Sequence, residues 1–178
     1  MDLKTKCLNK LKTEQVLARF YTDHYDESYY GFVIDFNDVY LVIEKFDDEC
    51  RYDGLTVFLR RDITRIKWSG NGIESASKLI DISKRQTSKI NIDLTSIPTV
   101  LQSVNRLYNH LTVYTQDIDN GFCYVGQIYE VDDNSVVIHE FGTKETLDRC
   151  FVLLSIEDIT RIDAGGQYEN NLRVLFNQ

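Results

Sequence analysis

The side chains best suited to acid–base or nucleophilic chemistry are three histidines and four cysteines. No histidine stands at a metal-ligand spacing from a cysteine or carboxylate, so structural or solvated histidines are favoured over a metal site. The cysteines resemble small apolar core residues; a nucleophilic Cys–His pair is the alternative, but no catalytic signature accompanies it. The residues are His24, His110, His139, Cys7, Cys50, Cys123 and Cys150. The sequence predicts no catalytic residue, no metal and no cofactor.

Charged residues form two further groups that could bind a ligand. Carboxylates gather at 23–27 and 47–53, but without the ligand order of an EF-hand, so solvated loops are favoured over a cation site. Basic residues gather at 60–67 and again at 78–89, which is the strongest argument in the sequence for an anionic partner such as RNA, although the net negative charge of the chain opposes it. The alternative is that these charges protect strand edges from aggregation. The candidate partner-binding residues of this basic patch are Arg60, Arg61 and Arg65.

These residues belong to a sequence that occurs twice. Residues 62–66, Asp-Ile-Thr-Arg-Ile, recur letter for letter at 158–162, which makes Arg161 a further candidate. The offset between the copies grows from 93 to 95 to 96 along the chain. Repeat 2 thus gains two residues before Gly126 and one between Phe141 and Asp158, in polar stretches where loops tolerate insertions. We infer a duplication.

The identity of the repeated pentapeptide has a structural interpretation. Its Asp is expected to cap a one-turn helix, and its two Ile side chains are expected to point into the core. Thr and Arg would then lie on the outer rim. A shared fold therefore explains the identity without a ligand.

Periodicity predicts the elements that position these residues. Apolar side chains at helical spacing predict a helix near 3–11 and a second at 97–108, with Thr95 or Ser96 as its cap and Pro98 in its first turn. Each helix is followed by alternating or short apolar runs that indicate five strands. The expected strands are 16–22, 29–36, 39–46, 55–60, 63–67, 111–116, 122–131, 135–141, 150–155 and 159–163.

The pattern around each second and third strand resembles the Sm/LSm family. Gly31 and Gly126, with the apolar residues that follow, match the family's first motif. The resemblance implies a mainly β protein with helices: two Sm-like or SH3-like five-stranded barrels, each preceded by an α-helix. The predicted organisation is repeat 1 at residues 1–68, a connector at 69–95 and repeat 2 at 96–178. The connector is expected to contain a short helix near 74–85.

The family's RNA-contacting positions are occupied differently here. Its Asn is replaced by Tyr40 in repeat 1 and Ser135 in repeat 2, and both remain candidate partner-binding residues. Its Arg is replaced by Leu59 and Ser155. The resemblance therefore supports the predicted fold more strongly than it supports RNA binding.

Composition bounds the remaining possibilities. The 178 residues carry a formal net charge of −8, which weakens non-specific attraction to nucleic acid or an anionic membrane. No stretch is apolar enough to span a membrane and no signal peptide is visible, so scattered reduced cysteines predict a cytoplasmic protein. Eleven tyrosines favour protein recognition, since Tyr joins apolar area to a polar tip.

The sequence thus predicts a non-enzymatic protein-interaction or scaffold module. The two repeats are expected to pack as a pseudo-dimer that could oligomerise further, with a protein as partner and no membrane. The alternative is an RNA-binding Sm-like protein that uses the basic patch of repeat 1. An enzyme with a site between the repeats is the third hypothesis, for which no nucleophile, base or phosphate loop is visible.

Overall fold

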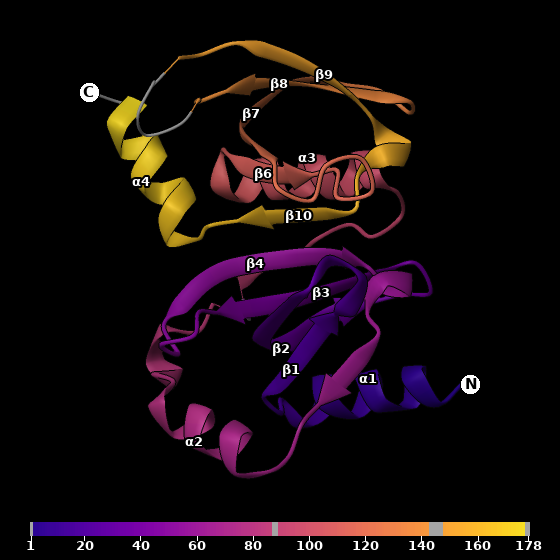
Figure 1. Cartoon of the computed structure of the whole chain (residues 1–178), viewed down its shortest axis with the longest axis vertical. Coiled ribbons are helices and arrows are strands. Elements are labelled where there is room, and N and C mark those ends of the chain that lie inside the picture. Colours follow the sequence, from indigo (N-terminus) through magenta and orange to yellow (C-terminus); the bar gives the residue numbers. More distant parts are fainter. Residues whose placement is uncertain (1, 87–88, 143–147, 177–178) are drawn as a thin grey trace. The chain divides into compact units, whose positions relative to one another are not determined.

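The computed structural model describes residues 2–86, 89–142 and 148–176. The chain divides into two compact units, residues 1–90 (unit 1) and 91–178 (unit 2). Within the described residues it forms four α-helices and ten strands, whose order along the chain Figure 1 shows. Unit 1 contains α1 (Leu3–Glu14), β1 (Ala18–Thr22), β2 (Glu27–Phe36), β3 (Tyr40–Phe46), β4 (Tyr52–Leu59), β5 (Arg65–Lys67) and α2 (Asn71–Leu79). Unit 2 contains α3 (Ile97–Tyr108), β6 (Leu111–Tyr114), β7 (Cys123–Val131), β8 (Ser135–Glu140), β9 (Phe151–Ser155), β10 (Arg161–Ala164) and α4 (Gln167–Phe176).

The five strands pair in the same antiparallel order in both units. The order is β5-β1-β2-β3-β4 in unit 1 and β10-β6-β7-β8-β9 in unit 2. The strands curve, β4 and β9 visibly so (Figure 1). Within the described part of each unit, however, the first and last strands of this order do not pair with each other, so the sheets are not closed into barrels. The prediction of closed barrels is therefore wrong, because apolar alternation shows which face of a strand is buried and not whether the two edges meet.

Register shows the duplication at the level of hydrogen-bonded pairs. Ala18 lies opposite Gly31 in unit 1, and Leu111 lies opposite Gly126 in unit 2. In both units a β-bulge interrupts the second strand just after this glycine. A Cβ on Gly31 would lie 2.7 Å from the carbonyl oxygen of Glu44, and one on Gly126 would lie 2.3 Å from that of His139. The glycines are thus required by close backbone approach where the strands bend.

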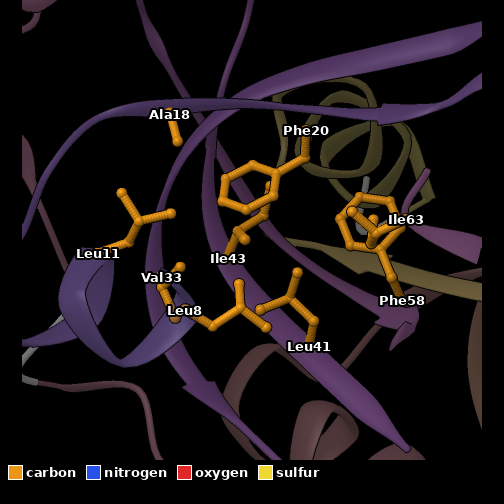
Figure 2. Packing of buried hydrophobic residues seen from close by; sticks show 9 residues of the cluster. All are labelled: Leu8, Leu11, Ala18, Phe20, Val33, Leu41, Ile43, Phe58 and Ile63. Carbon is orange, nitrogen blue, oxygen red and sulfur yellow. The ribbon is translucent and has the colours of Figure 1, made fainter. Parts of the chain in front are cut away.

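The core of unit 1 lies between α1 and one face of its sheet. Leu8 and Leu11 of α1 are buried because they lie three residues apart on one side of the helix. Figure 2 shows their side chains packed with those of the strands, including Val33 and Leu41. The full cluster comprises Leu8, Leu11, Ala18, Phe20, Val33, Leu41, Ile43, Phe58 and Ile63.

A second helix, α2 in unit 1 and α4 in unit 2, packs against the strands of each unit. In unit 1, Ile73 and Ala76 of α2 pack with Phe32 and Phe46. In unit 2, Leu172 of α4 packs with Val125 and Phe141, the counterparts of Tyr30 and Phe46. The predicted connector helix is thus confirmed, although it begins at Asn71 and belongs to unit 1. Helix α4 was not predicted from the sequence.

Local signals for α3 were interpreted correctly. Ser96 is the N-cap and forms a capping box with Thr99, and Pro98 lies in the first turn. All ten predicted strands are present, with ends shifted by at most three residues. The two-residue insertion before Gly126 falls in the loop between β6 and β7, as predicted. The one-residue insertion was placed between Phe141 and Asp158, a stretch that includes residues 143–147, which lie outside the described residues. No helix in the described ranges combines the length and apolar character needed to cross a bilayer.

Candidate functional site

Arg60, a candidate partner-binding residue, is buried inside unit 1. Its guanidinium donates to the hydroxyl of Thr5 at 2.5 Å and to the carbonyl of Asn37 at 3.1 Å. It also lies 3.4 Å from a carboxylate oxygen of Asp2 and of Asp38. These contacts fasten the start of α1 to the turn between β2 and β3. Arg60 therefore stabilises the fold and does not present its charge to a partner.

The positions that contact RNA in the Sm family lie next to each other in both units. Tyr40 pairs with Leu59 across β3 and β4, and Ser135 pairs with Ser155 across β8 and β9. Tyr40 is buried and Ser135 is half-buried. The pocket beside Ser155 measures about 240 Å³ and is lined by Asp133, Asn134, Ser155, Ile156 and Glu157. Two carboxylates in that lining oppose the binding of a phosphate backbone.

Arg61 and Arg65 are exposed, but both lie beside carboxylates. Nε of Arg65 donates to Asp23 at 2.7 Å. Hydrogen bonds from Arg65 and then from Thr64 lower the pKa of Asp23 to about 2, so this carboxylate is charged at neutral pH. Arg61 lies 3.6 Å from Asp62. The exposed arginines of the basic patch are thus compensated by neighbouring acids.

The repeated pentapeptide leads into β5 in unit 1 and into β10 in unit 2, and its threonine forms hydrogen bonds with the first strand of the unit, β1 or β6. The hydroxyl of Thr64 donates to the carbonyl of Tyr21 at 3.0 Å, and that of Thr160 donates to the carbonyl of Tyr114 at 3.2 Å. The backbone N–H groups of both threonines donate to the same carbonyls, at 2.9 and 3.0 Å. The identity between the copies thus has a structural cause, as predicted.

Two details of the predicted pentapeptide geometry are different. Asp62 and Asp158 are the last residues of short 3-10 helices, η2 (Arg60–Asp62) and η5 (Ile156–Asp158), and neither caps its helix. The capping prediction is wrong because each helix begins two residues before its Asp. The isoleucines Ile63 and Ile159 are buried, as predicted.

Arg161 of the second copy is buried, which corrects its predicted position on the outer rim. Its guanidinium carbon lies 3.5 Å from the ring centre of Tyr114, and its Nε lies 3.3 Å from a carboxylate oxygen of Asp163. In unit 1 the same contact is solvent-exposed, with Arg65 at 4.2 Å from the ring centre of Tyr21. Both arginines cover the tyrosine of the first strand, but only Arg65 lies on the surface.

The cysteines lack the environment of nucleophiles. Burial raises the pKa of Cys7, Cys50 and Cys123, and a hydrogen bond to Glu140 raises the pKa of Cys150. A raised pKa keeps each thiol protonated at neutral pH, whereas the thiolate is the reactive form. No group of three or more His, Cys, Asp or Glu side chains that could hold a metal occurs in the part of the chain that the structure describes.

Formal charge is divided unequally between the units. Residues 1–90 contain 15 basic and 15 acidic residues, whereas residues 91–178 contain 5 basic and 13 acidic residues. The entire net charge of −8 therefore lies in the second half.

An exposed aromatic patch on unit 2 was not predicted from the sequence. The patch, which we call the β9 patch, consists of Tyr129, His139, Phe151 and Leu153. The ring of Phe151 stacks on that of His139 with centres 4.3 Å apart and meets the ring of Tyr129 at 5.0 Å. Tyr129, Phe151 and Leu153 are 68%, 58% and 70% exposed. Contiguous exposed apolar side chains are typical of interaction sites, whereas scattered ones are not.

Two residues of the β9 patch, Phe151 and Leu153, belong to β9 itself, which is an edge strand. Among the described residues β9 pairs with β8 and with no other strand. Phe151 lies opposite His139 in that ladder, and Leu153 lies two residues further on the same face. An edge strand of this kind can form main-chain hydrogen bonds with another chain. A signal for this surface was present, since Phe-Val-Leu-Leu at 151–154 is apolar on both faces.

Comparisons of the chain with protein-family models, with curated proteins and with solved structures find no match.

Proposed function

We propose that this chain is a non-enzymatic protein-interaction module built from two Sm-like units, and that the β9 patch of unit 2 is its main contact surface. The observation that carries the proposal is the stacked, exposed ring cluster beside the free edge of β9. Covering a Phe or Leu side chain contributes about 1.5–3 kcal/mol, so the patch can supply a substantial part of a binding free energy.

The expected partner is an extended protein segment. An unpaired strand edge accepts such a segment through main-chain hydrogen bonds, and neighbouring side chains then give specificity. Apolar side chains of the segment would cover Phe151 and Leu153, and basic side chains would complement the acidic residues of unit 2. The free edge, the exposed patch and the charge of this unit all favour the same kind of partner.

The Sm-like part of the proposal has its own support. Each unit begins with a helix followed by five antiparallel strands, and each has the motif glycine at the bend of its second strand. RNA binding by the basic patch has less support, because Arg60 is buried and Arg65 is neutralised by Asp23. The protein-interaction proposal is therefore preferred.

Affinity capture from the native cell extract, treated with nuclease, tests this function with two matched variants. Leu153→Ser removes a side chain of the patch that is 70% exposed, and Leu79→Ser removes one on α2 that is 71% exposed. We expect the wild type and Leu79→Ser to retain the same protein and Leu153→Ser to lose it. The captured protein is then identified and its binding measured with the purified components. Loss of all retention on nuclease treatment, or equal binding by all three chains, would overturn the proposal.

A further inference from the structure

A pocket of about 250 Å³ opens on unit 1, and Lys67 is the one residue of the predicted basic patch that lines it. Arg19 and Tyr21 of β1 line it together with Tyr30 of β2 and Lys67 of β5. Its remaining wall is the segment 69–73 at the start of α2. Three strands and a helix start thus converge on one small cavity.

The register of the sheet places the two cations side by side. Arg19 lies opposite Tyr30 on one side and opposite Lys67 on the other. Because directly opposed residues of antiparallel strands share a face, all three side chains point to the same side of the sheet. The guanidinium carbon of Arg19 lies 5.0 Å from the ring centre of Tyr30 and 5.4 Å from that of Tyr21. The rings of Tyr21 and Tyr30 thus lie next to the positive charges of Arg19 and Lys67.

Within the described residues, Arg19 and Lys67 differ from several arginines of unit 1 in having no carboxylate beside them. Arg60, Arg65 and Arg85 each have a carboxylate within 3.4 Å. In the described part of the chain the guanidinium of Arg19 has only Ser28 as a side-chain hydrogen-bond partner, at 3.0 Å, and the ammonium of Lys67 lies 5.4 Å from the ring centre of Tyr21 and forms no ion pair. No carboxylate lines the pocket. Two uncompensated cations therefore share a concave site in a chain whose net charge is negative.

The glycine-containing wall leaves room for a ligand. A Cβ at Gly70 or Gly72 would meet nothing within 4 Å, so the cavity is open at these positions. The hydroxyl of Ser69 and the backbone of the segment supply polar groups beside the cations. The positive charge of the site, however, comes from Arg19 and Lys67.

We propose that this pocket binds a phosphate group, either as inorganic phosphate or as the phosphomonoester of a small molecule. A guanidinium matches two oxygens of a phosphate in one plane, and a lysine ammonium adds a point charge. A volume of about 250 Å³ lies just below the usual range for small-molecule sites, so it suits a phosphate with a small substituent. This site is independent of the β9 patch.

The chain carries its own reporter for the test. Its single tryptophan, Trp68, is exposed and lies between Lys67 and Ser69, which both line the pocket. The full-length protein is titrated with inorganic phosphate, with glycerol phosphate and with chloride at constant ionic strength, and tryptophan fluorescence is recorded. We expect a saturable change with phosphate and none with chloride. Tighter binding of glycerol phosphate would identify a phosphomonoester, and equal or weaker binding would identify free phosphate.

Variants separate the pocket from general charge effects. Removing one charged hydrogen-bond donor is expected to weaken phosphate binding by about tenfold or more in Lys67→Gln and in Arg19→Gln. Arg19→Lys keeps the charge without the planar fork and is expected to bind with intermediate affinity. Lys78→Gln is the matched control, because it removes the same charge from α2 outside the pocket lining. A chloride response equal to that of phosphate, or unchanged binding by Lys67→Gln, would overturn the proposal.

Discussion

The two threonines of the repeated pentapeptide make the same hydrogen bonds in different surroundings. Thr160 is buried and its hydroxyl accepts from the N–H of Gln116 at 3.1 Å, whereas Thr64 is exposed and accepts from the N–H of Asp23 at 3.2 Å. Thr160→Val leaves a buried N–H without this acceptor, and we expect a loss of about 1–3 kcal/mol in unfolding free energy.

Thr64→Val is the internal control for this prediction. At this exposed position water replaces the hydroxyl both as acceptor from the N–H of Asp23 and as donor to the carboxylate of Asp23, so the expected effect is within about 0.5 kcal/mol. Denaturant unfolding of both variants gives the two free energies. Equal losses would mean that burial does not distinguish the two copies of this contact.

The first isoleucine of each pentapeptide fills the interior of its unit. Ile63 packs with Phe20 and Phe58 in unit 1, and Ile159 is buried in unit 2. Replacing either isoleucine by Ala is expected to cost about 2–5 kcal/mol, from lost burial and the cavity that remains. Denaturant unfolding measures the change. An unfolding midpoint that stays unchanged in both variants would contradict the interior placement.

His110 makes stability depend on pH. It is fully buried between α3 and β6, and its Nδ1 donates to the carbonyl of Tyr108 at 2.7 Å. Burial lowers its pKa below 6.5 in the folded state. Below about pH 6.5 the unfolded chain binds a proton that the folded chain does not, so folding becomes less favourable as pH falls towards the folded pKa.

The unfolding free energy is therefore expected to fall from pH 7.5 to pH 5.5, and to fall less in His110→Gln. His24→Gln serves as the comparison, because the side chain of His24 is exposed and its loss removes a histidine without changing a buried position. The slopes with pH are compared, not the absolute values. An identical slope in wild type and His110→Gln would remove His110 as the cause.

At the scale of elements, an ion pair fastens the segment after α2 to the sheet of unit 1. Glu44 on β3 is fully buried and lies 2.8 Å from Nε of Arg85, whose guanidinium carbon lies 3.8 Å from the ring centre of Phe32. Glu44→Gln removes the charge and leaves a mostly buried guanidinium without its anion. We expect a loss of about 1–3 kcal/mol and faster amide exchange across Asn71–Leu79.

Asp81→Asn is the control that tests whether loss of an exposed carboxylate near α2 destabilises unit 1 as Glu44→Gln is expected to do. Asp81 is exposed and its closest cation is Lys84 at 3.6 Å, so this substitution is expected to leave stability within about 0.5 kcal/mol of the wild type. Exchange across α2 that is equally slow in Glu44→Gln and wild type would show that apolar packing alone holds this helix.

The elements were predicted from the sequence with different success for physical reasons. The strands were predictable because period-two alternation follows directly from strand geometry. Helix α4 was not, since Leu172 and Phe176 are its main apolar contacts and the polar Glu169 is also buried. Glu169 is buried because it accepts a hydrogen bond from Thr112 of β6, which local sequence does not reveal.

The candidate site was less predictable than the fold. A cluster of basic residues indicated a binding patch, but the partners that bury Arg60 lie on α1 and in the turn between β2 and β3, far along the chain. The β9 patch was missed for the same reason, since Tyr129 and Phe151 become neighbours only when β7, β8 and β9 pair. Spacing in sequence cannot report such cross-strand neighbours.

At the scale of the whole molecule, two copies of one architecture have acquired different surfaces. Unit 1 is neutral overall and holds a pocket with two uncompensated cations. Unit 2 carries the entire net negative charge and exposes aromatic side chains at a free edge. The duplication thus conserves the hydrogen bonds that define the fold, and the differences lie in surface side chains that can bind different partners.

Amide hydrogen exchange of the chain, alone and bound to its captured partner, tests the interaction proposal most directly. If an extended segment adds to the free edge, the amides of Phe151–Ser155 gain new acceptors and exchange more slowly in the complex. We predict that the strongest new protection falls in β9, and that Leu153→Ser abolishes it. Protection confined to unit 1, with exchange in β9 unchanged, would contradict the proposal.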